Sequence, residues 1–363
     1  MNSKIVLFVA RYSLTGVPQA QIRLAEALYR RGNEVDFVFG FIPGDIKAPE
    51  IKGVNIINFN QPRVFKLIAL IVSYIKNNKP NIIFTAEDHL NIVVLLAAIA
   101  SRSKVKISCS SRVTPYDTYS RKPFTKRWTL KYLMRMVMWR ADALTCVSQG
   151  TVDEYRNVFD SPRHVCVYNI VDKKHLQLKM QEPIAHEWYL PKDRPLLVAA
   201  GSLGAWKGYS DLIRAMKLLS QRKKVRLLIF GDGPLRAELE ALIVELDLSD
   251  VVRLMGQVEN PLKYFANSDV FAHSALTESF GNVLVEAMAC GCTPVSTNCP
   301  TGPREILQDG KYGFLVPMQD PEAMAHALQM AIENPMSPAQ LKEAIEPFTE
   351  ERIIQKHLDV LGI

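Results

Sequence analysis

A chain of 363 residues and 40.9 kDa is longer than one ordinary hydrophobic core requires, so its length predicts two domains. Hydrophobic residues make up 48% and charged residues 22% of the sequence, a composition that excludes a disordered chain and a membrane bundle. The net charge of +7 is uneven: residues 1–168 hold 24 Lys and Arg against 12 Asp and Glu, and the remainder holds 20 against 25. The basic first half predicts an anionic surface or polymer as a partner.

The N-terminus predicts a first strand, because the apolar run 5–10 is far shorter than the about 18 residues of a spanning helix and no small-residue cleavage site follows it. The six cysteines show no C-x-x-C pair and no histidine at ligand spacing. We therefore expect small buried residues rather than a zinc site, in a reduced cytoplasmic setting.

Strand-like runs alternate with helical patterns along the chain, which is typical of parallel sheets covered by helices on both faces. In the first half we expect strands at 5–10, 34–40, 81–84, 105–109 and 143–147, and helices at 19–31, 64–79, 91–102 and 126–140. After the polar stretch 172–195 we expect strands at 196–200, 226–230, 252–255, 270–273 and 293–296, and helices at 210–221, 234–246 and 282–289.

These patterns predict an α/β fold with two doubly wound, Rossmann-like domains, 1–168 and 169–346, that face each other across a cleft. A final helical segment within 347–363 is expected to cross back to the first domain. Ligands of such sheets bind at the carboxyl ends of the strands, so the motifs at those ends are the candidates for function.

The stretch 277–291, TESFGNVLVEAMACG, predicts a glycine turn that opens a helix near Asn282. The backbone N–H groups of Gly281, Asn282 and Val283, with the positive end of the helix, suit a phosphate or diphosphate. Glu286 is the single charge in a helix that is apolar on all sides and is expected to be buried, so its carboxylate needs a cation or hydroxyl partners. Ribose hydroxyls would satisfy it, and so would a nearby arginine in a purely structural role.

The second half resembles the retaining glycosyltransferases of family 4, which have the GT-B fold, through five segments in the family's order. They read GSLGAWKGYSDLIRAM, LLIFGDGPLRAELE, VRLMGQVEN, TESFGNVLVEAMACG and CPTGPREILQDGKYGFLV. The first half agrees more loosely, through LAEALYRRGNEV, KPNIIF, RADALTCVSQG and VYNIVD. The resemblance implies that Glu286 accepts hydrogen bonds from the donor ribose. It also implies that Glu278 and the backbone of Phe280, Gly281 and Asn282 face the transferred sugar and the diphosphate.

The family's cationic pattern G-R-L-x-x-x-K-G reads GSLGAWKG here. Lys207 keeps the lysine, which the resemblance places on the leaving diphosphate, whereas Ser202 replaces the arginine. Arg112 or Arg304 would supply the missing charge, unless each forms only an ordinary salt bridge.

The first half departs further from the family, in which many members have a Gly-Gly loop after the first strand and a histidine after the fourth. Here the first loop has Gly16 alone, and Arg112 stands near the histidine position, so the role of that histidine is not carried over. His89 is an alternative on the acceptor side, or else a packed residue at a strand end. In the second half, Gly231 in FGDGPL and Val258 after LMGQ resemble the loops around the nucleotide base, and a dinucleotide loop is disfavoured because its third glycine is missing.

Two basic segments of the first half predict contact with an anionic membrane surface. RKPFTKRWTLKYLMRMVMWR places Arg127, Lys131 and Arg135 on one helical stripe, and PRVFKLIALIVSYIKNNK has lysines around an apolar middle. Either segment alone is also compatible with a core helix that has a solvated basic rim. Nucleic acid is not expected as the anionic partner, because no binding motif is present.

Together these features predict a retaining glycosyltransferase that moves a hexose or N-acetylhexosamine from a nucleotide diphosphate sugar to a lipid-linked or cell-surface glycan. UDP is favoured because uridine is common in the family, and the inner face of the cytoplasmic membrane is the expected location. The sequence has no D-x-D motif, so neither a metal nor another cofactor is expected. The alternatives are a nucleotide-sugar epimerase of the same fold and a non-catalytic scaffold that binds glycans or sugar nucleotides.

Overall fold

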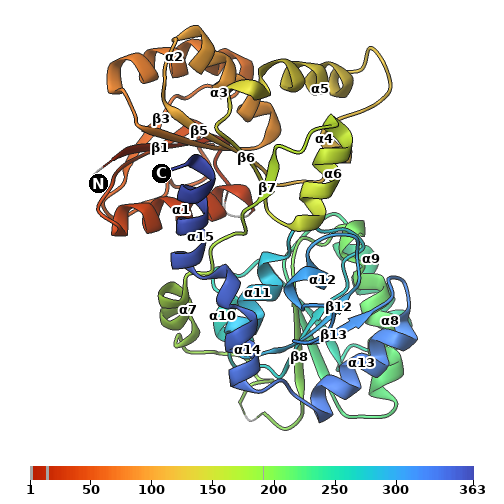
Figure 1. The fold of residues 1–363 in the computed structure, drawn as a ribbon. Helices are drawn as coiled ribbons and strands as arrows, with labels where there is room; N and C mark the ends of the chain where they lie inside the picture. The colour runs from red at the N-terminus through yellow and green to blue at the C-terminus, as the bar shows by residue number, and fades with distance from the viewer. Residues whose placement is uncertain (1–2, 14–15, 191) are drawn as a thin grey trace. The chain divides into compact units, whose positions relative to one another are not determined.

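The computed structural model describes residues 3–13, 16–190 and 192–363. The chain forms two compact units (Figure 1). Unit 1 comprises residues 1–170 and 350–363, and unit 2 comprises residues 171–349. The sequence had placed these two boundaries after residues 168 and 346.

Unit 1 contains a seven-stranded parallel sheet in the order β3-β2-β1-β4-β5-β6-β7. Its strands are β1 (Lys4–Arg11), β2 (Glu34–Phe41), β3 (Asn55–Asn58), β4 (Ile82–Ala86), β5 (Lys106–Ser111), β6 (Ala143–Cys146) and β7 (His164–Cys166). Its helices are α1 (Val17–Arg30), η1 (Val64–Lys66), α2 (Leu67–Asn78), α3 (Asp88–Ala100), α4 (Pro115–Thr118), α5 (Lys126–Val137), η2 (Met138–Arg140), α6 (Gln149–Phe159) and α15 (Glu350–Leu361). The sequence did not predict β3 and β7, because both are short edge strands with little apolar character.

Strand β1 shows why the sheet is covered on both faces. Val6, Phe8 and Ala10 belong to one buried cluster, with residues of α2 and α3. Ile5, Leu7 and Val9 belong to a second cluster, with residues of α1 and α15. A strand buried on both faces reads as a continuous apolar run, which is why it could be recognised in the sequence.

Unit 2 contains a six-stranded parallel sheet in the order β10-β9-β8-β11-β12-β13. Its strands are β8 (Leu196–Ala200), β9 (Arg226–Phe230), β10 (Val252–Gly256), β11 (Val270–His273), β12 (Thr293–Thr297) and β13 (Phe314–Val316). Its helices are α7 (Lys173–Met180), η3 (Ala205–Lys207), α8 (Tyr209–Ser220), α9 (Arg236–Glu245), α10 (Leu262–Phe265), α11 (Asn282–Ala289), α12 (Pro303–Ile306), α13 (Pro321–Glu333), α14 (Pro338–Ala344) and η4 (Glu346–Phe348).

The strand order of unit 2 reverses between β8 and β11, which are neighbours in the sheet. At such a reversal the loops that follow the two strands lead in opposite directions and leave a crevice for ligands at the carboxyl edge. The loop after β8 carries Lys207, and the loop after β11 carries Glu278. The topology thus brings the two predicted catalytic residues of unit 2 to one place.

In the described parts of the chain, every helix is too short or too polar to cross a bilayer.

Candidate functional site

Lys207 and Glu278 form a close ion pair at the carboxyl edge of the unit 2 sheet. The Nζ atom of Lys207 donates to Oε2 of Glu278 across 2.5 Å. Only 15% of the lysine side chain and 19% of the glutamate side chain are exposed, so the pair is largely withdrawn from water. If either side chain were removed, the other would be left as a buried charge without a partner, which is costly. Both charges lie at the edge of the sheet where ligands of such folds bind.

Backbone contacts fix the two loops that carry this pair. The hydroxyl of Ser274 donates to the carbonyl of Lys207 at 2.8 Å, and the N–H of Leu276 donates to the carbonyl of Trp206 at 2.8 Å. These hydrogen bonds join the loop after β8 directly to the loop after β11. A shift of one loop would therefore move the other and change the distance between Lys207 and Glu278.

The carboxylate of Glu278 is ionised at neutral pH. Burial by itself would raise its pKa, but the neighbouring His273 ring and the positive charge of Lys207 outweigh burial and lower the pKa to about 2. A permanent negative charge therefore lies beside the lysine in the absence of any ligand.

Helix α11 begins directly beside this pair. Its N-cap is Gly281, whose φ of 105° favours glycine, and no side chain caps the helix. The preceding residues are anchored: the Phe280 ring is 2% exposed and packs edge-on against Phe348 at 5.4 Å, and the hydroxyl of Thr301 donates to the carbonyl of Glu278. The Phe280 side chain is therefore enclosed within unit 2, and the assignment of the backbone of 280–282 to a ligand stays a prediction.

The expectation that α11 is buried on all sides is wrong. Leu284, Val285, Ala287 and Met288 are buried against the sheet and α14, but Asn282, Val283, Glu286 and Ala289 are only partly buried. Glu286 stands four residues after Asn282, so the two side chains share the open face of the helix. Its carboxylate is therefore partly exposed and lies one turn from the helix N-terminus that borders Glu278.

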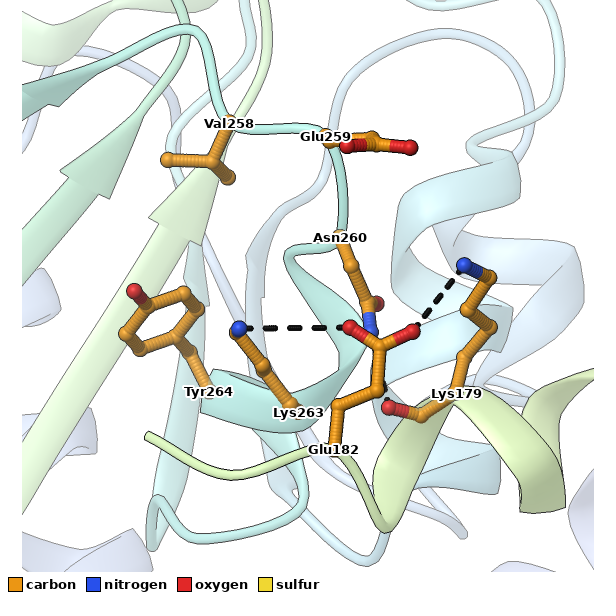
Figure 2. A pocket seen from close by; sticks show the side chains of 7 residues that line it. All are labelled: Lys179, Glu182, Val258, Glu259, Asn260, Lys263 and Tyr264. Atoms are coloured by element: carbon orange, nitrogen blue, oxygen red, sulfur yellow. Dashed lines mark hydrogen bonds and ion pairs between the residues drawn. The ribbon is translucent and has the colours of Figure 1, made fainter. Parts of the chain in front are cut away.

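A cavity of about 230 Å³ lies where β10 passes into α10 (Figure 2). It is lined by Lys179, Glu182, Val258, Glu259, Asn260, Lys263 and Tyr264. Glu182 pairs with Lys179 at 3.0 Å and with Lys263 at 3.9 Å, as the dashed lines in Figure 2 show. Lys207, Glu278 and Glu286 do not line this cavity, so it is separate from the ion pair.

The other predicted donor residues lie at the same edge of the sheet. The N–H of Gly231, which follows β9, donates to the carbonyl of Gly256 at 2.8 Å and so fixes the loop that leads to Val258. Ser202 is exposed in the loop after β8. Arg304 is engaged in an exposed ion pair with Asp309, which is the surface arrangement that the sequence left open for it.

The predicted residues of unit 1 follow neighbouring strands of its sheet. Gly16 caps α1 after β1, with a φ of 67°. His89 lies in the first turn of α3 after β4, with Nε2 3.4 Å from a carboxylate oxygen of Glu87. Arg112 follows β5 and donates to the side-chain oxygen of Asn169, and its Nε is buried without a hydrogen-bond partner among the described residues. Because β1, β4 and β5 are adjacent, all three residues share the carboxyl edge of this sheet.

Comparison with known proteins gives the family. Residues 180–347 match the family model described as glycosyl transferases group 1, and residues 15–175 match glycosyltransferase family 4. An uncharacterized glycosyltransferase of Methanocaldococcus jannaschii is 30% identical over 297 residues, which are 73% of each chain. The chain belongs to the glycosyltransferase family that these two models describe.

Two further relatives extend the comparison. The N-acetylgalactosamine-N,N'-diacetylbacillosaminyl-diphospho-undecaprenol 4-alpha-N-acetylgalactosaminyltransferase of Campylobacter jejuni is 31% identical over 246 residues, which are 67% of this chain and 65% of that one. The crystal structure of Anabaena HepE in complex with UDP superposes with a TM-score of 0.77 at 20% identity and covers 99% of both chains. This likeness confirms the GT-B fold predicted for this glycosyltransferase.

Two residues beside the predicted site residues, Glu87 next to His89 and His273 next to Glu278, were not themselves predicted. Glu87 adopts a φ of 81°, which is strained for a non-glycine residue, and its pKa is raised to about 7 by burial and by the negative charge of Asp88. His273 ends β11, with Nε2 3.5 Å from Oε2 of Glu278. Their only sequence signal is their place at strand ends, in TAEDHL and VFAHS, where polar residues are common for many reasons.

Proposed function

We propose that this glycosyltransferase moves a hexose or N-acetylhexosamine from a UDP-sugar to a hydroxyl of a lipid-linked or cell-surface glycan, with retention of the anomeric configuration. The observation that carries the proposal is the buried ion pair of Lys207 and Glu278 beside the open N-terminus of α11. The names of its relatives support it: the Campylobacter jejuni enzyme acts on a diphospho-undecaprenol, and HepE binds UDP.

Each element of the donor would have its own partner in unit 2. Lys207 and the backbone of 281–283 would hold the diphosphate, because both present positive charge in a partly desolvated crevice. Glu286, on the open face of α11, would accept hydrogen bonds from the two ribose hydroxyls. The base would lie toward Val258 and Gly231, at the β10 side of the sheet edge where the cavity of Figure 2 opens.

The reaction would replace one glycosidic bond by another on the same face of the sugar. The bond from C1 to the diphosphate oxygen breaks, the acceptor oxygen bonds to C1, and the acceptor proton passes to the departing diphosphate oxygen. Lys207 would offset the charge that builds on the diphosphate, and Glu278 would stabilise the cationic character of the sugar in the transition state. No metal ion is needed in this scheme. On the acceptor side, His89, Arg112, Gly16 and the newly found Glu87 are the candidates.

Turnover distinguishes this proposal from its alternatives. We expect transfer of sugar from UDP-glucose or UDP-N-acetylglucosamine to a polyprenyl-diphosphate-linked sugar in the presence of EDTA, and an axial donor linkage should give an axial product by NMR. An epimerase would instead convert the donor alone into a new sugar nucleotide. A scaffold would bind the donor and leave it intact in every mixture, and an inverted product would contradict retention.

We also propose that the region around α5 binds an anionic membrane surface. Phe124, Trp128, Tyr132 and Met136 are spaced four residues apart and form a ridge, in which Phe124 and Trp128 lie 5.8 Å apart and Trp128 and Tyr132 lie 4.4 Å apart. Phe124 is 94% exposed and Met136 is 70% exposed, whereas Met134 and Val137 of the same helix are buried. An exposed apolar ridge beside basic side chains fits the interface of an anionic bilayer, in which rings enter the headgroup layer.

Vesicle sedimentation tests the membrane proposal. The protein should sediment with vesicles that contain phosphatidylglycerol and much less with pure phosphatidylcholine. The variant Lys126→Glu/Arg135→Glu should bind at least roughly tenfold more weakly, because each basic side chain near the surface contributes about 1 kcal/mol. The matched control is Arg222→Glu/Lys224→Glu, the same charge reversal at exposed positions of unit 2, which should bind as the wild type does. Equal losses in both variants would show that only net charge matters and would contradict a docking surface at α5.

A further inference from the structure

His273 has an unusual environment for a buried histidine. Its side chain is 3% exposed at the end of β11, and its two ring nitrogens face different partners. Nδ1 lies 2.9 Å from the hydroxyl of Ser296 on β12. Nε2 lies 3.5 Å from Oε2 of Glu278, an ion-pair contact, and makes no hydrogen bond among the described residues.

The hydrogen position in this chain of contacts follows from the ionisation of Glu278. The Ser296 hydroxyl has one proton, and it lies within reach of both the carbonyl of Thr297 at 3.0 Å and Nδ1 of His273. If the hydroxyl donates to the carbonyl, Nδ1 carries the ring proton and the lone pair of Nε2 faces a carboxylate, which is repulsive. If it donates to Nδ1, Nε2 carries the proton and directs it toward the carboxylate of Glu278. The second arrangement directs the Nε2 proton toward the carboxylate and removes the repulsion between two lone pairs.

We infer that His273 is a positioning residue for the proposed donor site: it links Ser296 to Glu278 and holds this carboxylate when a donor diphosphate draws Lys207 away. The inference rests on the proposed function, because Lys207 pairs with Glu278 in the structure and would pair with the donor diphosphate only if a donor binds there. In the ligand-free protein the cluster of Lys207, Glu278 and His273 is neutral overall. A bound diphosphate adds two negative charges and would attract the lysine, so Glu278 would keep the N–H of Ser279, which donates to it at 3.3 Å, and the His273 ring beside it.

This rearrangement favours the uptake of one proton from solvent by His273 on donor binding. Burial lowers the pKa of His273, and the charge of Lys207 lowers it further, whereas Glu278 raises it. When the lysine moves to the diphosphate, a cation leaves the neighbourhood of His273 and the two negative charges of the diphosphate arrive. The pKa of His273 should therefore rise. Tyr209 and Cys299 also lie near this cluster, but burial and the charge of Glu278 raise their pKa values, and both stay neutral in this range. Donor affinity should therefore increase as the pH falls.

The ligand-free protein gives the first test. NMR of protein labelled with nitrogen isotope in its histidines, compared with His273→Gln, identifies the His273 ring signals. We expect a neutral ring with the proton on Nε2 near neutral pH. A proton on Nδ1 would mean that the lone pair of Nε2 faces Glu278, and it would overturn the inference whether or not any donor binds.

Donor binding gives the second test, by calorimetry with UDP-glucose and UDP-N-acetylglucosamine, whose phosphates do not titrate near neutral pH. Wild-type affinity should rise by roughly tenfold between about pH 8 and about pH 6.5, since one proton taken up allows up to about tenfold per pH unit. His273→Gln keeps a donor at the position of Nε2, so it should bind within about threefold of the wild type at about pH 8 but lose the pH dependence.

Two further variants make the outcome specific. His273→Asn keeps a donor toward Ser296 but none toward Glu278, and it should bind roughly tenfold more weakly than His273→Gln. His326→Gln changes an exposed histidine of the same unit and should behave as the wild type. Equal binding by the Gln and Asn variants, or an unchanged pH dependence in His273→Gln, would overturn the inference. Absence of binding by every form would instead contradict the proposed function, and the NMR test would still decide the tautomer.

Discussion

Exchange of Lys207 for methionine is expected to lower the free energy of unfolding by about 3 kcal/mol and to weaken UDP binding by roughly a hundredfold. The stability loss arises because Glu278, which is 19% exposed, would be left as a buried charge without its cation. The affinity loss arises because the diphosphate would lose its positively charged partner. Urea denaturation and titration calorimetry measure the two effects separately.

The double variant Lys207→Met/Glu278→Gln separates the ion pair from the ligand site. It removes both charges, so stability should largely return while UDP binding stays weak. Lys223→Met is the matched control, because its pair with Glu333 is exposed to solvent, at 31% and 41%, and should contribute little to stability. A double variant no more stable than the single one, or a single variant that binds UDP normally, would contradict the role given to Lys207.

Substitution of Gly302 by alanine is expected to cost at least about 3 kcal/mol and to reduce UDP binding by tenfold or more. Gly302 has a φ of 91°, and a Cβ there would lie 2.0 Å from the carbonyl oxygen of Phe280. The loop from Glu278 to Gly281 would have to move away, and with it the start of α11. Urea denaturation measures the free energy of unfolding, and UDP calorimetry measures the affinity.

Gly291→Ala is the matched control for this substitution. Gly291 has a similar φ of 98°, but a Cβ there would meet nothing within 4 Å. It should therefore cost only the backbone strain, about 1–2 kcal/mol, and leave UDP binding unchanged. If both variants lose the same stability and affinity, contact with Phe280 is not what positions the loop.

Much of the fold could be predicted because the central strands are buried on both faces. Runs such as that of β1 contribute alternate residues to two different cores, and only continuous apolar sequence can do so. The edge strands β3 and β7 have no such requirement, and they were missed. The apolar edge strand β13 was also missed, and so were the helices α6 and α13, although both contribute buried residues to the cores.

The site was predictable only in part, because its contacts are long-range. Lys207 and Glu278 are 71 positions apart. The family resemblance assigned both to the donor site, but their ion pair was not predicted. The burial of Glu286 was misjudged, because an eight-residue apolar helix does not reveal which of its faces is covered. Glu87 and His273 were missed, since the strain of one and the partner of the other, Ser296, appear only after the sheet is assembled.

The measurement that tests the donor site most directly is calorimetric binding of UDP, GDP, ADP and NAD to the wild type and to Glu286→Gln. The substitution keeps the shape of the side chain and removes the carboxylate that we assign to the ribose. We predict that one nucleoside diphosphate, UDP, binds and that the variant loses at least about 1.4 kcal/mol, a tenfold effect, without loss of thermal stability. Absence of binding by all four ligands, or equal UDP binding by a thermally weakened variant, would make this carboxylate structural and contradict the proposed donor site.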